Sequence, residues 1–136
     1  MAEVEKSKKL KRLVAVQRHV EKMTENELSM VIRERAEVAE ATARTVNVMT
    51  SLDPLHRSLS RNYLERFAKL TSRDKQLGNL QRTQETRLAK ERKKGDKLEE
   101  KMKEARVAET RVADDNAVYD LIEMTLALKD TSLQQG

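Results

Sequence analysis

Apolar side chains recur along this chain at alternating spacings of four and three residues, which is the pattern of a helix that packs along one seam. Between residues 10 and 52 the positions on this spacing are Leu10, Val14, Gln17, Glu21, Thr24, Leu28, Val31, Arg35, Val38, Thr42, Thr45, Met49 and Leu52. Gln17, Glu21 and Arg35 interrupt the apolar row, so the first seam is imperfect. The pattern therefore predicts a long helix that pairs with another helix.

The same spacing resumes after the single proline, Pro54, and continues to residue 133. Its positions are Tyr63, Phe67, Leu70, Asp74, Leu77, Gln81, Gln84, Leu88, Glu91, Gly95, Leu98, Met102, Ala105, Glu109, Val112, Asn116, Tyr119, Glu123, Leu126, Asp130 and Leu133. A second and longer helix is predicted here. Gly78 and Gly95 are two places where it could bend or end, because a glycine inside a helix costs about 1 kcal/mol relative to alanine.

Pro54 marks the boundary between the two predicted helices. Inside a helix a proline removes a backbone hydrogen bond and clashes with the preceding turn, but it is tolerated at the first helical position. Asp53 is a suitable cap, because its carboxylate can accept a hydrogen bond from a free amide of the first turn. We therefore predict an all-α protein, in which residues 1–136 form a single antiparallel two-helix coiled-coil hairpin with a break near Pro54. The first helix is expected at about residues 3–51, and the connector and second helix at about 54–133.

The unequal lengths of the two helices constrain how the hairpin closes. A first helix of about 45 residues is roughly 70 Å long, and the second is nearly twice that length. A tight turn at Pro54 would leave the apolar residues of the C-terminal end beyond the start of the first helix, and exposing apolar surface costs about 25 cal/mol per Å². We therefore expect residues 54 to about 77 to cap the hairpin, so that the two termini pair. The alternative is that the C-terminal end docks on a partner.

Composition narrows the class of protein further. Aromatic residues make up 2% of the chain and charged residues 38%, with three glycines and one proline, which favours long helices over a compact core or a disordered segment. The net charge of +5 favours an acidic partner surface. The chain has no cysteine, no apolar signal segment near Met1 and no apolar run long enough for a bilayer. These features predict a cytoplasmic protein without direct membrane insertion.

Residues suited to catalysis or metal binding are sparse. His19 and His56 have no second ligand at helical spacing, and neighbouring positions such as Asp114 and Asp115 diverge on a helix. No phosphate-binding glycine loop or zinc spacing is present. Base-stacking aromatic residues are nearly missing, which argues against specific nucleic-acid recognition. We therefore expect no enzyme activity, no cofactor and no metal site.

The opening from Leu10 to Arg18 is similar to the Leu-x-x-Leu-x-x-x-Arg-like start of the FliJ family of flagellar type III export. The Glu/Arg/Ala-rich stretch from Glu21 to Arg44 and the Arg/Lys/Glu-rich second helix add to this resemblance, which extends to the injectisome relative YscO. The resemblance implies a non-catalytic stalk or adaptor that binds the hexameric export ATPase ring and couples it to the membrane protein of the export gate. It also implies a place at the cytoplasmic side of the inner-membrane export apparatus.

Two kinds of side chain are candidates for contact with a protein partner: the basic start of the first helix and the apolar end of the second. They are Lys8, Lys9, Lys11, Arg12, Leu13, Arg18, Tyr119, Ile122 and Leu126. Which end meets the partner, whether the chain is monomeric or dimeric, and whether the system is flagellar or an injectisome stay open. The competing interpretations are a generic coiled-coil scaffold or adaptor and a basic helical nucleic-acid-associated accessory.

Overall fold

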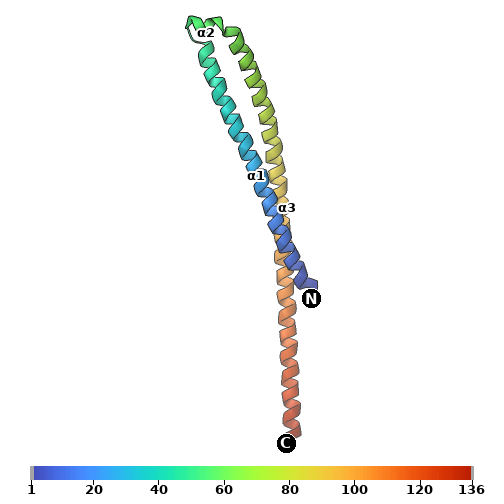
Figure 1. The fold of residues 1–136 in the computed structure, drawn as a ribbon. Coiled ribbons are helices and arrows are strands. Elements are labelled where there is room, and N and C mark those ends of the chain that lie inside the picture. The colour runs from blue at the N-terminus through green and yellow to red at the C-terminus, as the bar shows by residue number, and fades with distance from the viewer. Residues whose placement is uncertain (1, 136) are drawn as a thin grey trace. The chain divides into compact units, whose positions relative to one another are not determined.

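Three helices make up the described backbone, residues 2–135, and the computed structural model describes side chains for residues 6–132. Helix α1 spans Ala2–Met49, the short helix α2 spans Pro54–Ser58 and helix α3 spans Ser60–Gln135. The chain runs up α1, turns through α2 and returns along α3 (Figure 1). The predicted all-α hairpin with a break near Pro54 is confirmed. The side chain of Leu133, the last predicted seam position, lies outside the described residues.

The turn is built by local hydrogen bonds around Asp53. This residue has an extended backbone, with φ of −63° and ψ of 127°, and its carboxylate accepts a hydrogen bond from the amide of Leu55 at 2.9 Å. Pro54 occupies the first turn of α2, where its missing amide proton costs nothing. Helix α2 ends at Ser58, Leu59 caps it with φ of −103° and ψ of 11°, and α3 begins at Ser60. Leu52, a predicted seam position, is 79% exposed because the helix has already ended at Met49.

The chain divides into two units, which we call the turn unit, residues 18–93, and the terminal unit, residues 2–17 with 94–135. In the turn unit, every predicted seam position from Glu21 to Met49 is buried or half-buried. The same holds on α3 for the predicted positions from Tyr63 to Glu91. Leu77, at 1% exposure, is the most deeply buried large side chain. The four–three spacing therefore identifies the packed face of both helices.

The buried threonines of the first seam obtain their hydrogen bonds within their own helix. Thr24 and Thr45 are 2% and 4% exposed. The hydroxyl of Thr24 donates to the carbonyl of Val20 at 3.0 Å, and that of Thr45 donates to the carbonyl of Ala41 at 2.8 Å. A buried hydroxyl that keeps a hydrogen bond avoids most of the desolvation cost, so these threonines can pack in the seam as small side chains.

Arg35 interrupts the first seam, and two polar side chains of α3 accept hydrogen bonds from its guanidinium group. Its Nε donates to the Asp74 carboxylate at 3.0 Å and its guanidinium donates to the Gln81 side chain at 3.1 Å. Between these two partners lies Gly78, where a Cβ atom would stand 3.2 Å from the Arg35 guanidinium. The absence of a side chain at Gly78 therefore leaves room for Arg35. Helix α3 is continuous through both Gly78 and Gly95, so neither glycine breaks it.

In the terminal unit, the start of α1 packs antiparallel on the segment of α3 that begins at Lys94. The amide of Ser7 donates to the Glu109 carboxylate at 3.2 Å, which fixes the register. Met102 and Ala105 are each 8% exposed. Predicted seam positions up to Glu109 are buried or half-buried here as well, but those from Val112 to Asp130 are exposed. The packed seam on α3 therefore stops close to the start of α1.

The expected pairing of the two termini is wrong. The turn closes within residues 50–59, and α3 is already a regular helix from Ser60, so residues 54–77 do not form a cap. Because Ser7 lies beside Glu109, the last part of α3 extends past the start of α1 with no described helix beside it (Figure 1). A tight turn fixes the backbone of only a few residues. A cap reaching residue 77 would also have to interrupt α3 and restart it, and starting a helix is unfavourable.

Candidate interaction surface

Five basic residues and no acidic ones lie between positions 6 and 17, at the start of α1. Lys8, Lys9, Lys11 and Arg12 are all exposed, because the seam of α1 faces α3 and these positions lie off it. Leu13 is 51% exposed beside them. The predicted basic contact residues therefore form an accessible positive surface, which we call the basic segment, with one apolar side chain in reach of a partner.

Arg18 differs from the other basic candidates. Its guanidinium lies 3.0 Å from the Glu21 carboxylate on the same helix, and it is only 36% exposed. Glu21 is 9% exposed, so this ion pair neutralises a nearly buried carboxylate in the seam. The geometry assigns Arg18 a role in packing as well as any role in partner contact.

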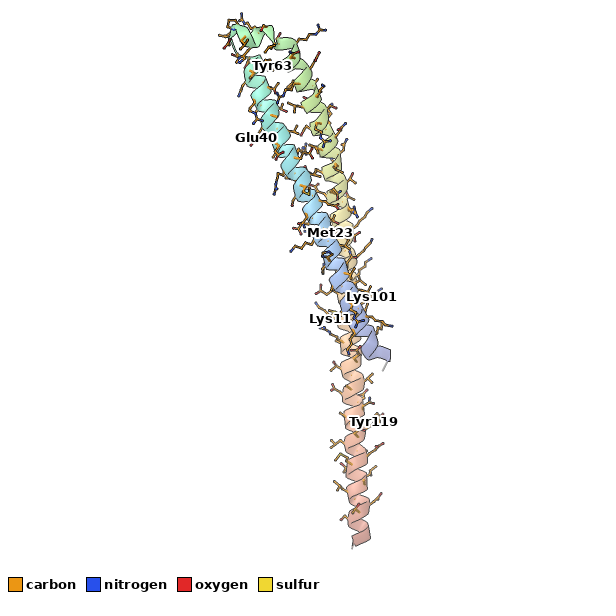
Figure 2. All side chains as sticks on the ribbon, in the orientation of Figure 1. Lys11, Met23, Glu40, Tyr63, Lys101 and Tyr119 are labelled. Carbon is orange, nitrogen blue, oxygen red and sulfur yellow. The ribbon has the colours of Figure 1, made fainter. Side chains whose placement is uncertain are left out.

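The end of α3 is the most exposed part of the described chain. Every side chain from residue 110 to residue 132 is exposed, and we call this segment the tail. Three of the predicted contact residues lie here: Tyr119 is 67%, Ile122 49% and Leu126 57% exposed. Figure 2 shows Tyr119 on a bare stretch of helix, in contrast to Lys101, which lies where α1 and α3 run together. Single exposed apolar residues are ordinary, but a contiguous run of them marks an interaction surface.

Most of the apolar residues of the tail fall into two rows on nearly opposite sides of the helix, and Val118, 55% exposed, lies between the rows. One row, the Tyr119 stripe, consists of Val112, Tyr119, Ile122 and Leu126. The other row, the Leu121 stripe, consists of Ala117, Leu121, Met124 and Leu128. At 3.6 residues per turn these rows are separated by about half a turn. A helix that is apolar on two sides is typical of one buried between neighbours. The Leu121 stripe is a part of this surface that the predicted contact residues did not include.

A groove of about 550 Å³ lies beside the packed part of the terminal unit. Its walls come from both helices: Lys6 and Leu10 from α1, and Lys101, Glu104, Ala105 and Ala108 from α3. We call the small residues Ala105 and Ala108 the floor of the groove, and its charged residues Lys6, Lys101 and Glu104 the rim. The spacing of Ala105 and Ala108 in the sequence is the signal that could have indicated it, because small residues at helical spacing allow another helix to approach closely.

The tail and the basic segment carry opposite charge. Residues 110–132 contain five acidic and two basic residues, whereas residues 6–17 contain five basic and none acidic. Both belong to the terminal unit. The acidic tail is suited to a partner surface with basic flanks, since complementary charges guide two proteins into the right orientation as they meet.

The described part of the chain also bears on metal binding and on membrane insertion. No group of three or more histidine, aspartate or glutamate side chains there is placed to hold a metal ion. No helix among these residues combines the length and apolarity needed to cross a bilayer. His56 packs edge-on against Tyr63, with ring centroids 6.3 Å apart, and so belongs to the packing of the turn. The accessible features are thus a positive surface, a groove and an apolar tail.

Comparison with known proteins adds no relative: no family model, no curated protein and no solved structure matches this chain. What the chain does must therefore be inferred from its own residues, from the resemblance of its sequence pattern, and from the surfaces described above.

Proposed function

We propose that this chain is a non-catalytic stalk or adaptor of a flagellar-type protein export apparatus. In this role it binds the hexameric export ATPase and couples it to the export gate at the cytoplasmic side of the membrane. The observation that carries the proposal is the uncovered tail of α3, a helix end whose apolar side chains are exposed and that no other described part of the terminal unit covers. The resemblance to FliJ and YscO supports the identity of the partner.

The shape of the tail suits insertion among several protein surfaces at once. Apolar rows on two sides of one helix can be buried only if neighbours approach from both sides. A ring of subunits around a central channel provides such surroundings. The basic segment supplies a second contact, which would attract an acidic rim by charge.

A coiled-coil scaffold without an ATPase partner is the second candidate. The same exposed tail supports it, because a scaffold also needs an apolar surface for its partners. The two candidates differ in one measurable respect, which is whether a purified export ATPase binds the chain.

The test is a titration of purified wild-type protein into a hexameric type III export ATPase at low salt, with binding and turnover both recorded. We expect binding and increased ring assembly or turnover. Reversing the charge of Lys8, Lys9, Lys11 and Arg12 to Glu should weaken this binding. The loss should shrink as salt rises, since exposed charges are screened beyond about 8 Å at physiological ionic strength.

The matched control reverses four exposed lysines elsewhere, Lys69, Lys75, Lys90 and Lys93, and so changes the net charge equally. It should bind nearly as wild type if the basic segment makes a specific contact. Equal losses in both variants would show that only net charge matters. If the wild type does not bind the ATPase at all, the export proposal falls and the scaffold becomes the better account.

A further inference from the structure

One row of α3 continues from the groove into the tail, with the charged Asp115 at one of its positions. At spacings of four and three residues it contains Lys101, Ala105, Ala108, Val112, Asp115, Tyr119, Ile122 and Leu126. Lys101, Ala105 and Ala108 of this row line the groove, and Val112, Tyr119, Ile122 and Leu126 form the exposed Tyr119 stripe. All of these residues belong to the terminal unit. Ala105 and Ala108 make the row small where it lines the groove, and Tyr119, Ile122 and Leu126 make it bulky in the tail.

Two copies of this row placed antiparallel complement each other in shape, because the bulky residues of one copy face the small residues of the other. If two copies lie antiparallel with Val112 opposite Val112, then Tyr119 of one copy falls opposite Ala105 of the other, because each is seven residues from the centre. Ile122 then falls near Lys101 at the groove rim. A contact in which the same surface serves both partners closes by two-fold symmetry and needs no further copies.

We propose that the tail of one molecule occupies the groove of a second copy of this chain, and that the second copy does the same in return. The aromatic ring of Tyr119 packs over the small floor residues Ala105 and Ala108, and Leu10 of α1 adds an apolar wall. Lys6 and Lys101 can cover apolar side chains with their aliphatic stems while their ammonium groups stay in water.

Charge favours this arrangement over a parallel pair of tails. In the antiparallel arrangement the acidic tail lies along the part of the terminal unit that contains the basic segment. In a parallel pair the five acidic residues of each tail would lie beside those of the other, and like charges side by side are unfavourable. The Tyr119 stripe that enters the groove also contains the candidate partner contacts Tyr119, Ile122 and Leu126, so self-association and the proposed ATPase contact compete for this side of the tail.

The molar mass of the full chain in solution is the first measurement. Light scattering at about 100 µM protein should give a weight-average mass of about 1.8 times the monomer's 15.7 kDa, because about 80% of the chains are paired at this concentration if the dissociation constant is about 10 µM. A mass of 15.7 kDa at this concentration would overturn the proposal.

Matched variants then separate the two stripes of the tail. Tyr119→Asp with Ile122→Asp should raise the dissociation constant by about thirtyfold or more, the effect of losing a central hot-spot residue. Leu121→Asp with Met124→Asp makes the same change on the opposite side of the same helix and should leave the dimer intact. Circular dichroism checks that both variants keep their helicity. Equal loss of the dimer in both would contradict a groove contact by the Tyr119 stripe.

Single spin labels in the otherwise wild-type chain test the direction of pairing. The chain has no cysteine, so a label attaches only where one is introduced. At 1.5 Å per residue, labels at Ala113→Cys should differ by only about 3 Å along the axis, and labels at Thr125→Cys by about 39 Å. Short distances at both positions would show a parallel pair, and no measurable distance at Ala113→Cys would show that the centre lies elsewhere; either result would overturn the proposal.

Discussion

At the scale of single residues, the polar interruptions of the first seam have specific partners. Arg35 reaches across to Asp74 and Gln81 over the bare backbone of Gly78. Beside it, Arg73 forms an ion pair with Glu34. Since the two helices can slide only if these contacts break, Arg35 and its partners select one register among the several that a periodic seam would allow.

Removing Arg35 should therefore weaken the hairpin by a modest amount. The Arg35 and Asp74 side chains are 40% and 43% exposed, so their coupling should be about 0.5–1 kcal/mol, at the upper end for exposed pairs. A double-mutant cycle with Arg35→Ala and Asp74→Ala, followed by chemical denaturation, measures this coupling. A coupling energy near zero would show that the pair does not hold the register.

The deepest apolar side chain should have the largest single effect on stability. Leu77 is 1% exposed, so Leu77→Ala should cost about 2–4 kcal/mol through lost burial and a new cavity. Leu64, on the same helix but 55% exposed, is the matched control, and Leu64→Ala should change stability by less than about 0.5 kcal/mol. Thermal or chemical unfolding of both variants would decide. Similar losses at the two positions would mean that the seam is not where the core lies.

The packed positions could be predicted from the sequence because burial on a helix follows its period. The spacing identified Leu77, Leu88 and Met102 as seam residues, and all three are buried. It could not predict why Arg35 is tolerated, because the partners Asp74 and Gln81 are distant in sequence and the vacant space at Gly78 exists only in one register. A glycine inside a helix looks like a weak point until the side chain across from it is known.

At the scale of the elements, the turn at residues 50–59 separates α1 from α3. Asp53 caps α2 and Pro54 follows it at the first turn, as the sequence predicted. The prediction that residues 54 to about 77 cap the hairpin is wrong, because the seam pattern does not determine the register of the two helices. A seam with one repeating period is compatible with many registers, so the pattern could not determine which residue of α3 lies opposite the start of α1.

Loss of the cap should destabilise the turn measurably. Asp53→Ala removes the acceptor for the Leu55 amide and should cost about 1 kcal/mol. Asp53→Asn keeps an oxygen acceptor at the same place and should cost much less, because asparagine caps about as well as aspartate. Urea unfolding followed by circular dichroism compares the two. If both substitutions have the same effect, the side-chain cap does not stabilise the turn.

At the scale of the whole molecule, both proposed contacts require a tail that its own chain does not cover. The apolar character of Tyr119, Ile122 and Leu126 predicts that they are contact residues, but the sequence also predicts that their end of the chain pairs with the other terminus. The structure leaves them exposed, since α1 begins only near Glu109 and does not extend along the tail. Both proposals, a protein partner for the tail and pairing with a second copy, follow from this exposure.

The most direct test is the distance between spin labels at Leu13→Cys and Leu126→Cys in one molecule. Excess unlabelled protein is added so that only distances within a molecule contribute. Because Ser7 lies beside Glu109, Leu13 lies level with about Lys103, and Leu126 lies about 23 residues further along α3. We predict a distance of about 35 Å, with a Leu13→Cys and Lys103→Cys pair as the short reference. A distance below about 20 Å, two-thirds or less of that helix length, would mean that the termini pair and that the tail is covered by its own chain.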